Sequence, residues 1–170
     1  LRLVGQGTSA TSIEANLDLA GSSIIVEQVD VVANSPTGDV TMSGDQTSLS
    51  DVNADGTISV TGSGASVTDS NADSVTVSGS QASLDGVSAR NMITVESSAT
   101  GTSLNSTTAD GGVTVNNDDT SITGDSSVPA DTIVNTDTGE QFDTIYAAVD
   151  AANPGETVSV GAGTYNAGEG

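Results

Sequence analysis

The chain contains no cysteine, histidine, lysine or tryptophan among its 170 residues. The absence of cysteine and histidine excludes the usual zinc sites and the Ser-His or Cys-His pairs of nucleophilic enzymes. The only aromatic residues are Phe142, Tyr146 and Tyr165, whereas compact sandwiches and α/β enzymes anchor their cores on several large aromatic side chains. No apolar run approaches the roughly 18 residues that a membrane span needs, and no P-loop or dinucleotide fingerprint is present. We therefore predict no catalytic residue, no nucleotide cofactor and no membrane insertion.

Acidic residues dominate the charge of the chain. It carries 23 Asp and Glu residues against two cations, Arg2 and Arg90, which makes the net charge −21. Such a surface repels nucleic acid and anionic membranes, so neither is expected as a partner. It also repels itself, and molar salt screens that repulsion to within about 3 Å.

The choice of acidic residue is also informative, because Asp outnumbers Glu by 17 to 6 while lysine is absent. This composition resembles that of surface proteins from haloarchaea and from the viruses that infect them. The resemblance implies an extracellular location, on a virion or a cell surface, in a high-salt environment. Intrinsic disorder is the alternative for an acidic chain rich in Ser, Thr and Gly.

An internal repeat argues against disorder. One set of similar segments is Val40-Thr-Met-Ser-Gly44, Ile58-Ser-Val-Thr-Gly62, Val75-Thr-Val-Ser-Gly79, Ile93-Thr-Val-Glu-Ser97 and Val113-Thr-Val-Asn-Asn117. Each is followed by a member of a second set: Thr47-Ser-Leu49, Ala65-Ser-Val67, Ala82-Ser-Leu84, Thr102-Ser-Leu104 and Thr120-Ser-Ile122. Both sets recur every 17 to 20 residues, which indicates one supersecondary unit copied along an axis.

Each unit has the pattern of short β-strands. Val-Thr-Val alternates apolar and polar residues, and the Gly, Asn, Asp and Ser residues between the segments supply turns. The predicted fold is therefore an all-β parallel β-solenoid of about seven coils over residues 1–130, with a right-handed helix favoured. Ile13, Ile24 and Val31 are expected to extend the repeat towards the N-terminus, and Ile133 towards the C-terminus.

The alternation also predicts which side chains fill the interior. We expect two facing walls of aliphatic residues, with small alanines in a narrow corner. The first wall is Val40, Met42, Ile58, Val60, Val75, Val77, Ile93, Val95, Val113 and Val115. The second wall is Leu49, Val67, Leu84, Leu104 and Ile122, and the corner residues are Ala54, Ala72, Ala89 and Ala109.

The residue after each corner alanine forms a charged column: Asp55, Asp73, Arg90, Asp110 and Asp131. Carboxylates stacked about 4.8 Å apart repel one another. Because Arg90 lies between Asp73 and Asp110, we predict that it bridges both of them. A solvated surface arginine is the alternative.

A calcium site is a second candidate for a functional feature of the coil surface. Asp51, Asn53 and Asp55 match the opening of a calcium loop, and Asp69, Asn71 and Asp73 repeat the pattern one coil later. The twelfth position is Gly62 instead of a bidentate carboxylate, so the segment is not an EF-hand. Adjacent coils could still share a calcium ion through these six side chains, and no other cofactor is expected. The alternative is a structural role in turns, where Asx side chains bond to their own backbone.

Two further surface features point to glycans. Outward hydroxyl groups form two expected ladders, one of Thr41, Ser59, Thr76, Thr94 and Thr114, and one of Ser48, Ser66, Ser83, Ser103 and Ser121. Such ladders can bind glycans or ice, or can simply be good strand formers that tolerate water. Asn105-Ser-Thr107 is an acceptor sequon for N-glycosylation.

The pattern changes near residue 130. Phe142, Ile145, Val149 and Ala152 share one face of an expected helix over 143–152, which Asp143 can cap and Asn153-Pro-Gly155 ends. Phe142-Asp-Thr-Ile-Tyr-Ala-Ala-Val-Asp-Ala-Ala152, Pro154-Gly-Glu-Thr-Val-Ser-Val160 and Gly163-Thr-Tyr165 resemble the opening of pectin-lyase-like right-handed parallel β-helices. The resemblance covers about residues 132–166. It implies a capping helix and the start of a second β-helix over 131–170, and no activity.

Three functions follow as hypotheses. The first is an extracellular structural and adhesive solenoid: a fibre, spike or decoration of a haloarchaeal virus, or a haloarchaeal cell-surface stalk. Its expected partners are further copies of itself (a trimer is common among viral β-helices), other virion or surface-layer proteins, and host-surface glycans. The alternatives are the N-terminal part of a polysaccharide lyase or hydrolase, and a polymerising bactofilin-like filament subunit.

Overall fold

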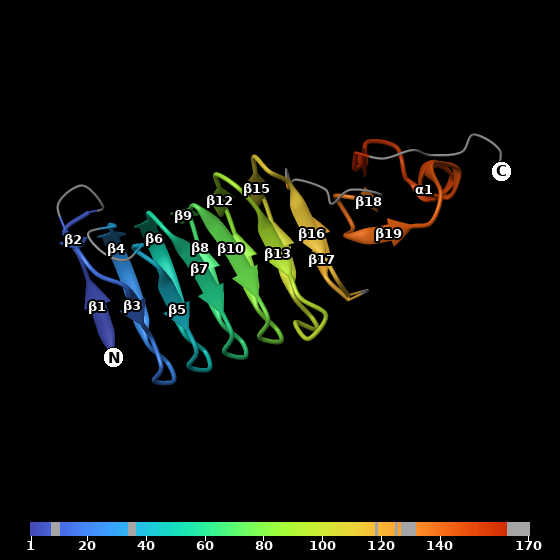
Figure 1. Ribbon diagram of the computed structural model, residues 1–170. Helices are drawn as coiled ribbons and strands as arrows, with labels where there is room; N and C mark the ends of the chain where they lie inside the picture. The colour runs from blue at the N-terminus through green and yellow to red at the C-terminus, as the bar shows by residue number, and fades with distance from the viewer. Residues whose placement is uncertain (8–10, 34–36, 118, 125, 127–131, 163–170) are drawn as a thin grey trace.

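The computed structural model is a parallel β-solenoid followed by a short α/β segment (Figure 1). It describes residues 1–7, 11–33, 37–117, 119–124, 126 and 132–162. Successive coils stack side by side from the N-terminus, and the C-terminal segment lies beyond the last coil. The all-β parallel solenoid with one short helix is thus confirmed.

Two parallel sheets form the walls of the solenoid. In the described part of the chain the larger sheet has eleven strands: β1 (Arg2–Val4), β2 (Ser12–Ile13), β4 (Ile25–Val31), β6 (Ser48–Ala54), β8 (Ser66–Thr68), β9 (Asn71–Ala72), β11 (Ser83–Asp85), β12 (Ser88–Ala89), β14 (Ser103–Asn105), β15 (Thr108–Ala109) and β17 (Ser121–Thr123). The smaller sheet has six: β3 (Leu17–Asp18), β5 (Val40–Met42), β7 (Thr57–Val60), β10 (Ser74–Val77), β13 (Ile93–Val95) and β16 (Val113–Val115).

The register of both sheets follows the sequence repeat. Val75 pairs with Ile58 on one side and Ile93 on the other, while Leu84 pairs with Val67 and Leu104. Each strand residue therefore lies beside the equivalent residue of the repeat in the neighbouring coils. This pairing makes a coil stable only through its neighbours.

The solenoid has about six turns, fewer than the seven expected. The predicted extension through Ile133 is wrong. Ile133 lies in β18 (Ile133–Asn135), which pairs antiparallel with β19 (Glu140–Phe142) and β20 (Val158–Val160) instead of joining either parallel sheet. At about 4.8 Å per coil, six turns make a stack about 29 Å long.

The predicted interior is confirmed almost throughout. The two aliphatic walls are buried, with Val115 only partly so, and of the corner alanines Ala54, Ala72 and Ala89 are buried while Ala109 is partly buried. The sequence pattern missed one interior column, which lies after a bend in the larger sheet: Val29, Val52, Ser70, Val87 and Thr107. Its buried Ser70 is satisfied, since its hydroxyl donates to the Thr68 carbonyl at 2.7 Å and accepts from the Val52 N–H at 3.2 Å.

The bends of each coil are made by left-handed residues stacked in columns. One column, with φ between 46° and 64°, is Gln28, Asp51, Asp69, Gly86, Ser106 and Gly124. We name it the corner column. In this conformation the backbone turns while the N–H still reaches the next coil, as when Asp69 donates to the Asp85 carbonyl at 2.9 Å. A second left-handed column is Ser23, Gln46, Gly64, Gln81 and Gly101.

A third column requires glycine for a different reason, namely close approach. A Cβ atom on Gly62 would lie 2.2 Å from the carbonyl oxygen of Gly44, and one on Gly79 would lie 2.1 Å from that of Gly62. Gly44 stands in the same relation to Gly21. Glycine lets the turns of successive coils pack backbone against backbone here.

The C-terminal segment combines the antiparallel sheet β19-β18-β20 with helix α1 (Ile145–Ala151). The predicted helix is confirmed, but its N-cap is Thr144, whose hydroxyl accepts from the Ala147 N–H at 3.1 Å, and not Asp143. Thr144 has the extended backbone that an N-cap needs. The Gly163-Thr-Tyr165 element of the resemblance lies outside the described residues, so a second β-helix stays a prediction.

The apolar face predicted for the helix is not the buried one. Ala148 is the buried residue of α1, whereas Ile145 is 40% exposed and Val149 is 63% exposed. The segment joins the last coil through Val134 of β18, which is fully buried in the aliphatic core of the solenoid, and through polar groups. The Gln141 side chain donates to the Thr120 carbonyl at 3.0 Å, and the Gly124 N–H donates to the Thr136 carbonyl at 3.2 Å.

Candidate functional site

The outer surface of the larger sheet carries an ordered polar column beside the corner column. Its members, in register from coil to coil, are Asp30, Asn53, Asn71, Ser88 and Thr108. We name it the polar column. It lies two residues after the corner column in each coil, so the same bends position both.

Hydrogen bonds along the polar column orient its side chains. The amide of Asn53 donates to the Asp30 carboxylate at 2.9 Å, and its oxygen accepts from the Asn71 amide at 2.8 Å. Further along, the hydroxyl oxygens of Ser88 and Thr108 lie 3.1 Å apart. Chains of this kind hold each side chain in one rotamer, which fixes where its remaining donors and acceptors point.

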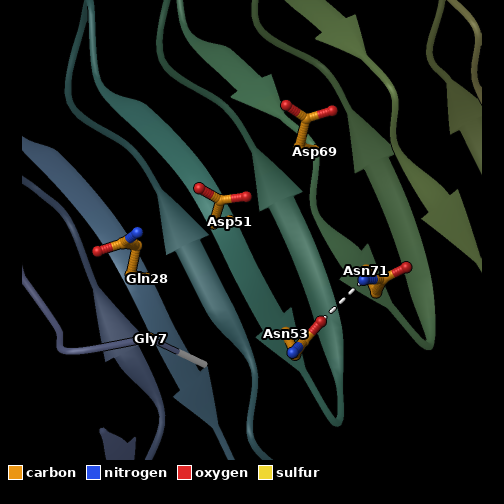
Figure 2. Close-up of a pocket in the computed structure, with 6 residues that line it drawn as sticks. All are labelled: Gly7, Gln28, Asp51, Asn53, Asp69 and Asn71. Atoms are coloured by element: carbon orange, nitrogen blue, oxygen red, sulfur yellow. Dashed lines mark hydrogen bonds between the residues drawn. The ribbon is translucent and has the colours of Figure 1, made fainter. Parts of the chain in front are cut away.

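Two shallow grooves flank the polar column. The first has a volume of about 430 Å³ and is lined by Gly7, Gln28, Asp51, Asn53, Asp69 and Asn71. Figure 2 shows its two rows of side chains, with Gln28, Asp51 and Asp69 in one row and the bonded pair Asn53 and Asn71 in the other. Within each row the members come from successive coils, so the groove runs along the stacking axis.

The second groove, also about 430 Å³, lies on the other side of the polar column. It shares Asn53 and Asn71 with the first groove, and Arg90 and Asp110 stand on its far wall. Together the grooves form one polar strip across the middle coils, with Ala72 and Ala89 as its only apolar lining residues in the described part of the chain.

The predicted bridge from Arg90 to Asp73 and Asp110 is corrected by the structure. The Arg90 guanidinium lies 3.8 Å from the Asp55 carboxylate, two coils away, in an exposed ion pair. Asp73 is engaged by a nearer partner, because both of its oxygens accept from the Asn91 amide at 2.9 Å. The long side chain of Arg90 extends past Asp73, whose carboxylate is already hydrogen-bonded to Asn91, and reaches Asp55. Arg90 still relieves the acidic column, though at a different member.

The six residues of the predicted calcium site are brought to one region but not to one point. Asp51 and Asp69 stand in the corner column, Asn53 and Asn71 in the polar column, and Asp55 and Asp73 in the acidic column beyond it. Asp55 accepts from the Ala33 N–H at 3.1 Å, which is a backbone-capping contact. Among the described residues no three Asp, Glu, His or Cys side chains gather as a metal site requires. A calcium ion shared through the asparagines stays a prediction from the sequence.

The side chain of Asn105, the predicted glycosylation site, is engaged in hydrogen bonds with the neighbouring coils. The Asn105 amide donates to the Asp85 carboxylate at 2.7 Å, and its oxygen accepts from Thr123 at 3.1 Å. Thr107 of the same sequon is buried. Attachment of a glycan would require these contacts to be broken.

Both predicted hydroxyl ladders are in register. Thr41, Ser59, Thr76, Thr94 and Thr114 pair in order on the smaller sheet, and Ser48, Ser66, Ser83, Ser103 and Ser121 on the larger. The members of the first ladder are all partly buried. This ladder lies on a different sheet from the two grooves.

One carboxyl group of the C-terminal segment has a lowered pKa. The Asn153 N–H, at 2.8 Å, is the main cause of the low pKa of Glu156, and the side chains of Asn135 and Asn153 add to it. All three donate to the charged form, which favours ionisation. Glu156 thereby ties the turn after α1 to strand β18, a structural role.

The corner column was missed by sequence reasoning, although a signal for it exists. In every coil it stands two residues after the buried residue of the second repeat, as Asp51 stands after Leu49 and Asp69 after Val67. The residues found there are Gln, Asp, Gly and Ser, most of which tolerate left-handed backbone. The positive φ was hidden because Gly occurs at only two of the six positions.

No family model, curated protein or solved structure matches the chain. The likeness to pectin-lyase-like β-helices and to haloarchaeal surface proteins therefore stays a prediction from the sequence. Within the described ranges, no helix has the length and apolar character needed to cross a membrane.

Proposed function

We propose that this protein is an extracellular structural and adhesive rod: a fibre, spike or decoration of a haloarchaeal virus, or a stalk on a haloarchaeal cell. The observation that supports this function is the continuous stack of coils in which inward side chains are aliphatic and buried while outward polar side chains bond to the next coil. Such a stack transmits load through many parallel backbone hydrogen bonds. It separates whatever is attached at its two ends by a set distance.

The charge of the chain supports a high-salt exterior location. With 23 carboxylates and two cations, the stack carries acidic residues on neighbouring coils throughout. Salt at molar concentration screens this repulsion, and the interior made of aliphatic side chains is strengthened by salting-out ions.

A homo-oligomer, the expected form, would have to associate through polar contacts along its sides. Of the exposed large apolar residues in the described part of the chain, only Ile25 and Met92 lie between the first coil and the C-terminal segment. Lateral association of a trimer would therefore bury hydroxyl, amide and carboxylate groups. This is compatible with assembly in high salt and predicts dissociation when salt is removed.

The rod function can be tested by changing its length. The chain has no native cysteine, so Ser22→Cys and Asn116→Cys provide two unique labelling sites on exposed residues. Duplicating residues 57–73, one full coil, should lengthen the distance between spin labels by about 4.8 Å, and two insertions by about 10 Å. An unchanged distance, or loss of the fold on insertion, would contradict the rod model.

The location has its own test. Antibodies against the folded chain should label intact virions or cells that encode it, at molar salt and without permeabilisation. Labelling that appears only after lysis would rule out an exterior role while leaving the rod geometry intact.

A further inference from the structure

We propose that the two grooves beside the polar column bind a neutral, hydroxyl-rich oligosaccharide that lies along the rod axis. This inference rests on the adhesive part of the proposed function and names the surface and the ligand class for it. It starts from three features of the strip: its fixed hydrogen-bonding groups, its unpaired corner side chains and its repeat distance.

The polar column offers donors and acceptors in fixed directions. An asparagine amide has two N–H donors, and its oxygen has two acceptor positions. Asn53 uses one donor on Asp30 and one acceptor position on Asn71, so one of each remains for a ligand. Asn71 uses one donor on Asn53. Side chains already held by their neighbours lose little entropy when a ligand binds.

The opposite wall of the first groove consists of side chains that have no other hydrogen-bonding task. Within the described residues, Gln28, Asp51 and Asp69 form no side-chain hydrogen bond or ion pair, and they line the groove (Figure 2). All three stand at left-handed positions where glycine would be the easier residue, as Gly86 and Gly124 show in the same column. Those two glycines do not line either groove.

The lining selects the class of ligand. Neither groove contains an aromatic or large apolar residue, so an apolar ligand would find no surface to cover. Asp51 and Asp69 would repel a uronic-acid polymer. Carboxylates and amides are well suited to accept from and donate to sugar hydroxyl groups, and these bonds persist at salt concentrations that screen simple charge attraction.

The spacing of equivalent groups along the strip favours an oligosaccharide chain over a single sugar as the ligand. Equivalent groups recur about every 4.8 Å along the strip, from coil to coil. Each coil contributes only a few hydrogen bonds, which are individually weak in water. A ligand that repeats along its own length can add these contacts over several coils, so affinity should increase with the number of sugar residues.

The experiment is calorimetric titration in 2 M NaCl with neutral gluco- and manno-oligosaccharides of increasing length. Oligogalacturonate and chitosan oligomers serve as the acidic and cationic comparisons. The key variant is Asp51→Gly/Asp69→Gly, because glycine is the residue that the corner column already uses and no fold loss is expected. It should lower affinity at least about tenfold for a neutral chain that the unaltered protein binds. Ser59→Ala/Thr76→Ala, on the other sheet, should leave affinity unchanged.

Three results would overturn the proposal: no binding of any neutral oligosaccharide, binding that the double glycine variant leaves unchanged, or binding limited to chitosan oligomers. Circular dichroism of each variant verifies that the solenoid is retained. The distance between the spin labels reports the number of coils and not ligand binding, so failure of glycan binding would leave the structural role standing, and failure of the rod model would be seen separately.

Discussion

The stacked coils and the C-terminal segment solve the problem of burying apolar surface in opposite ways. In the coils every inward position has its own copy above and below it, and the side chains of Ile58, Val75 and Leu84 are fully buried. In the C-terminal segment the helix exposes Tyr146 and Val149 and buries Ala148. Both stretches have clear apolar periodicity, so periodicity alone does not ensure burial.

The difference comes from what each stretch is given to pack against. Each coil of a repeat packs against the next coil, because the next coil has equivalent residues in register with its own. A single amphipathic helix must find a partner with a matching face, and the described residues offer α1 only a small antiparallel sheet. The coils should therefore respond strongly to interior changes, and the exposed face of α1 should not.

The largest effect is expected from a substitution that breaks the stacking itself. Gly62→Ala would place a Cβ atom 2.2 Å from the Gly44 carbonyl oxygen, which only a backbone shift can relieve. We expect a loss of about 4 kcal/mol in the free energy of unfolding. Chemical denaturation in molar salt measures it.

Gly64→Ala is the matched control for that substitution. Gly64 has a positive φ of 66°, but a Cβ there would meet only the Gln46 side chain at 3.7 Å. The loss should be near 1 kcal/mol, the typical penalty of a left-handed L-residue. Equal losses for the two variants would show that conformation, and not close approach, explains the glycines.

The second effect sharpens the contrast between the regions. Leu84→Ala removes a fully buried side chain from the coil interior and should lower stability by about 3 kcal/mol. Val149→Ala removes a side chain that is 63% exposed and should change stability by less than about 0.5 kcal/mol. A large loss for Val149→Ala would mean that the helix face is covered in solution, as a capping helix of a second β-helix would be.

A smaller effect is expected at the start of α1. Thr144→Ala removes the hydroxyl that accepts from the Ala147 N–H, and should destabilise the helix by about 1 kcal/mol. Hydrogen exchange of the α1 amides measures it without unfolding the coils. Asp143→Ala should leave exchange nearly unchanged. Faster exchange in Asp143→Ala than in Thr144→Ala would instead support Asp143 as the N-cap.

The smallest effect is expected at the exposed ion pair. Arg90→Ala should lower stability by no more than about 0.5 kcal/mol at low salt, and by less at 1 M salt, because the Arg90–Asp55 contact is 3.8 Å long and both side chains are solvated. A double-mutant cycle with Asp55→Asn should show coupling, and one with Asp73→Asn should show none. Coupling to Asp73 would support the bridge predicted from the sequence.

Much of the solenoid could be predicted because its information is local and repeated. The alternation in Val75-Thr-Val77 and the recurrence of residues equivalent to Leu84 predict the strands, the period and the two aliphatic walls. The candidate site was only half visible. The regular spacing of Asp51, Asn53, Asp69 and Asn71 predicts either a shared cation or a structural role in turns, because sequence spacing does not show which side of a bend each residue occupies.

The repeat alone establishes the parallel stacking, the two aliphatic walls and the acidic exterior, because a repeat with alternating polarity has one economical arrangement. The tertiary structure alone decided the left-handed corner column, the partner of Arg90, the orientation of Ile133 and the exposed face of α1. Each of these depends on contacts between residues from different coils or segments. Such contacts depend on the direction of the backbone at a bend and on which of several neighbouring groups occupies a donor or acceptor. The spacing of residues along the chain specifies neither.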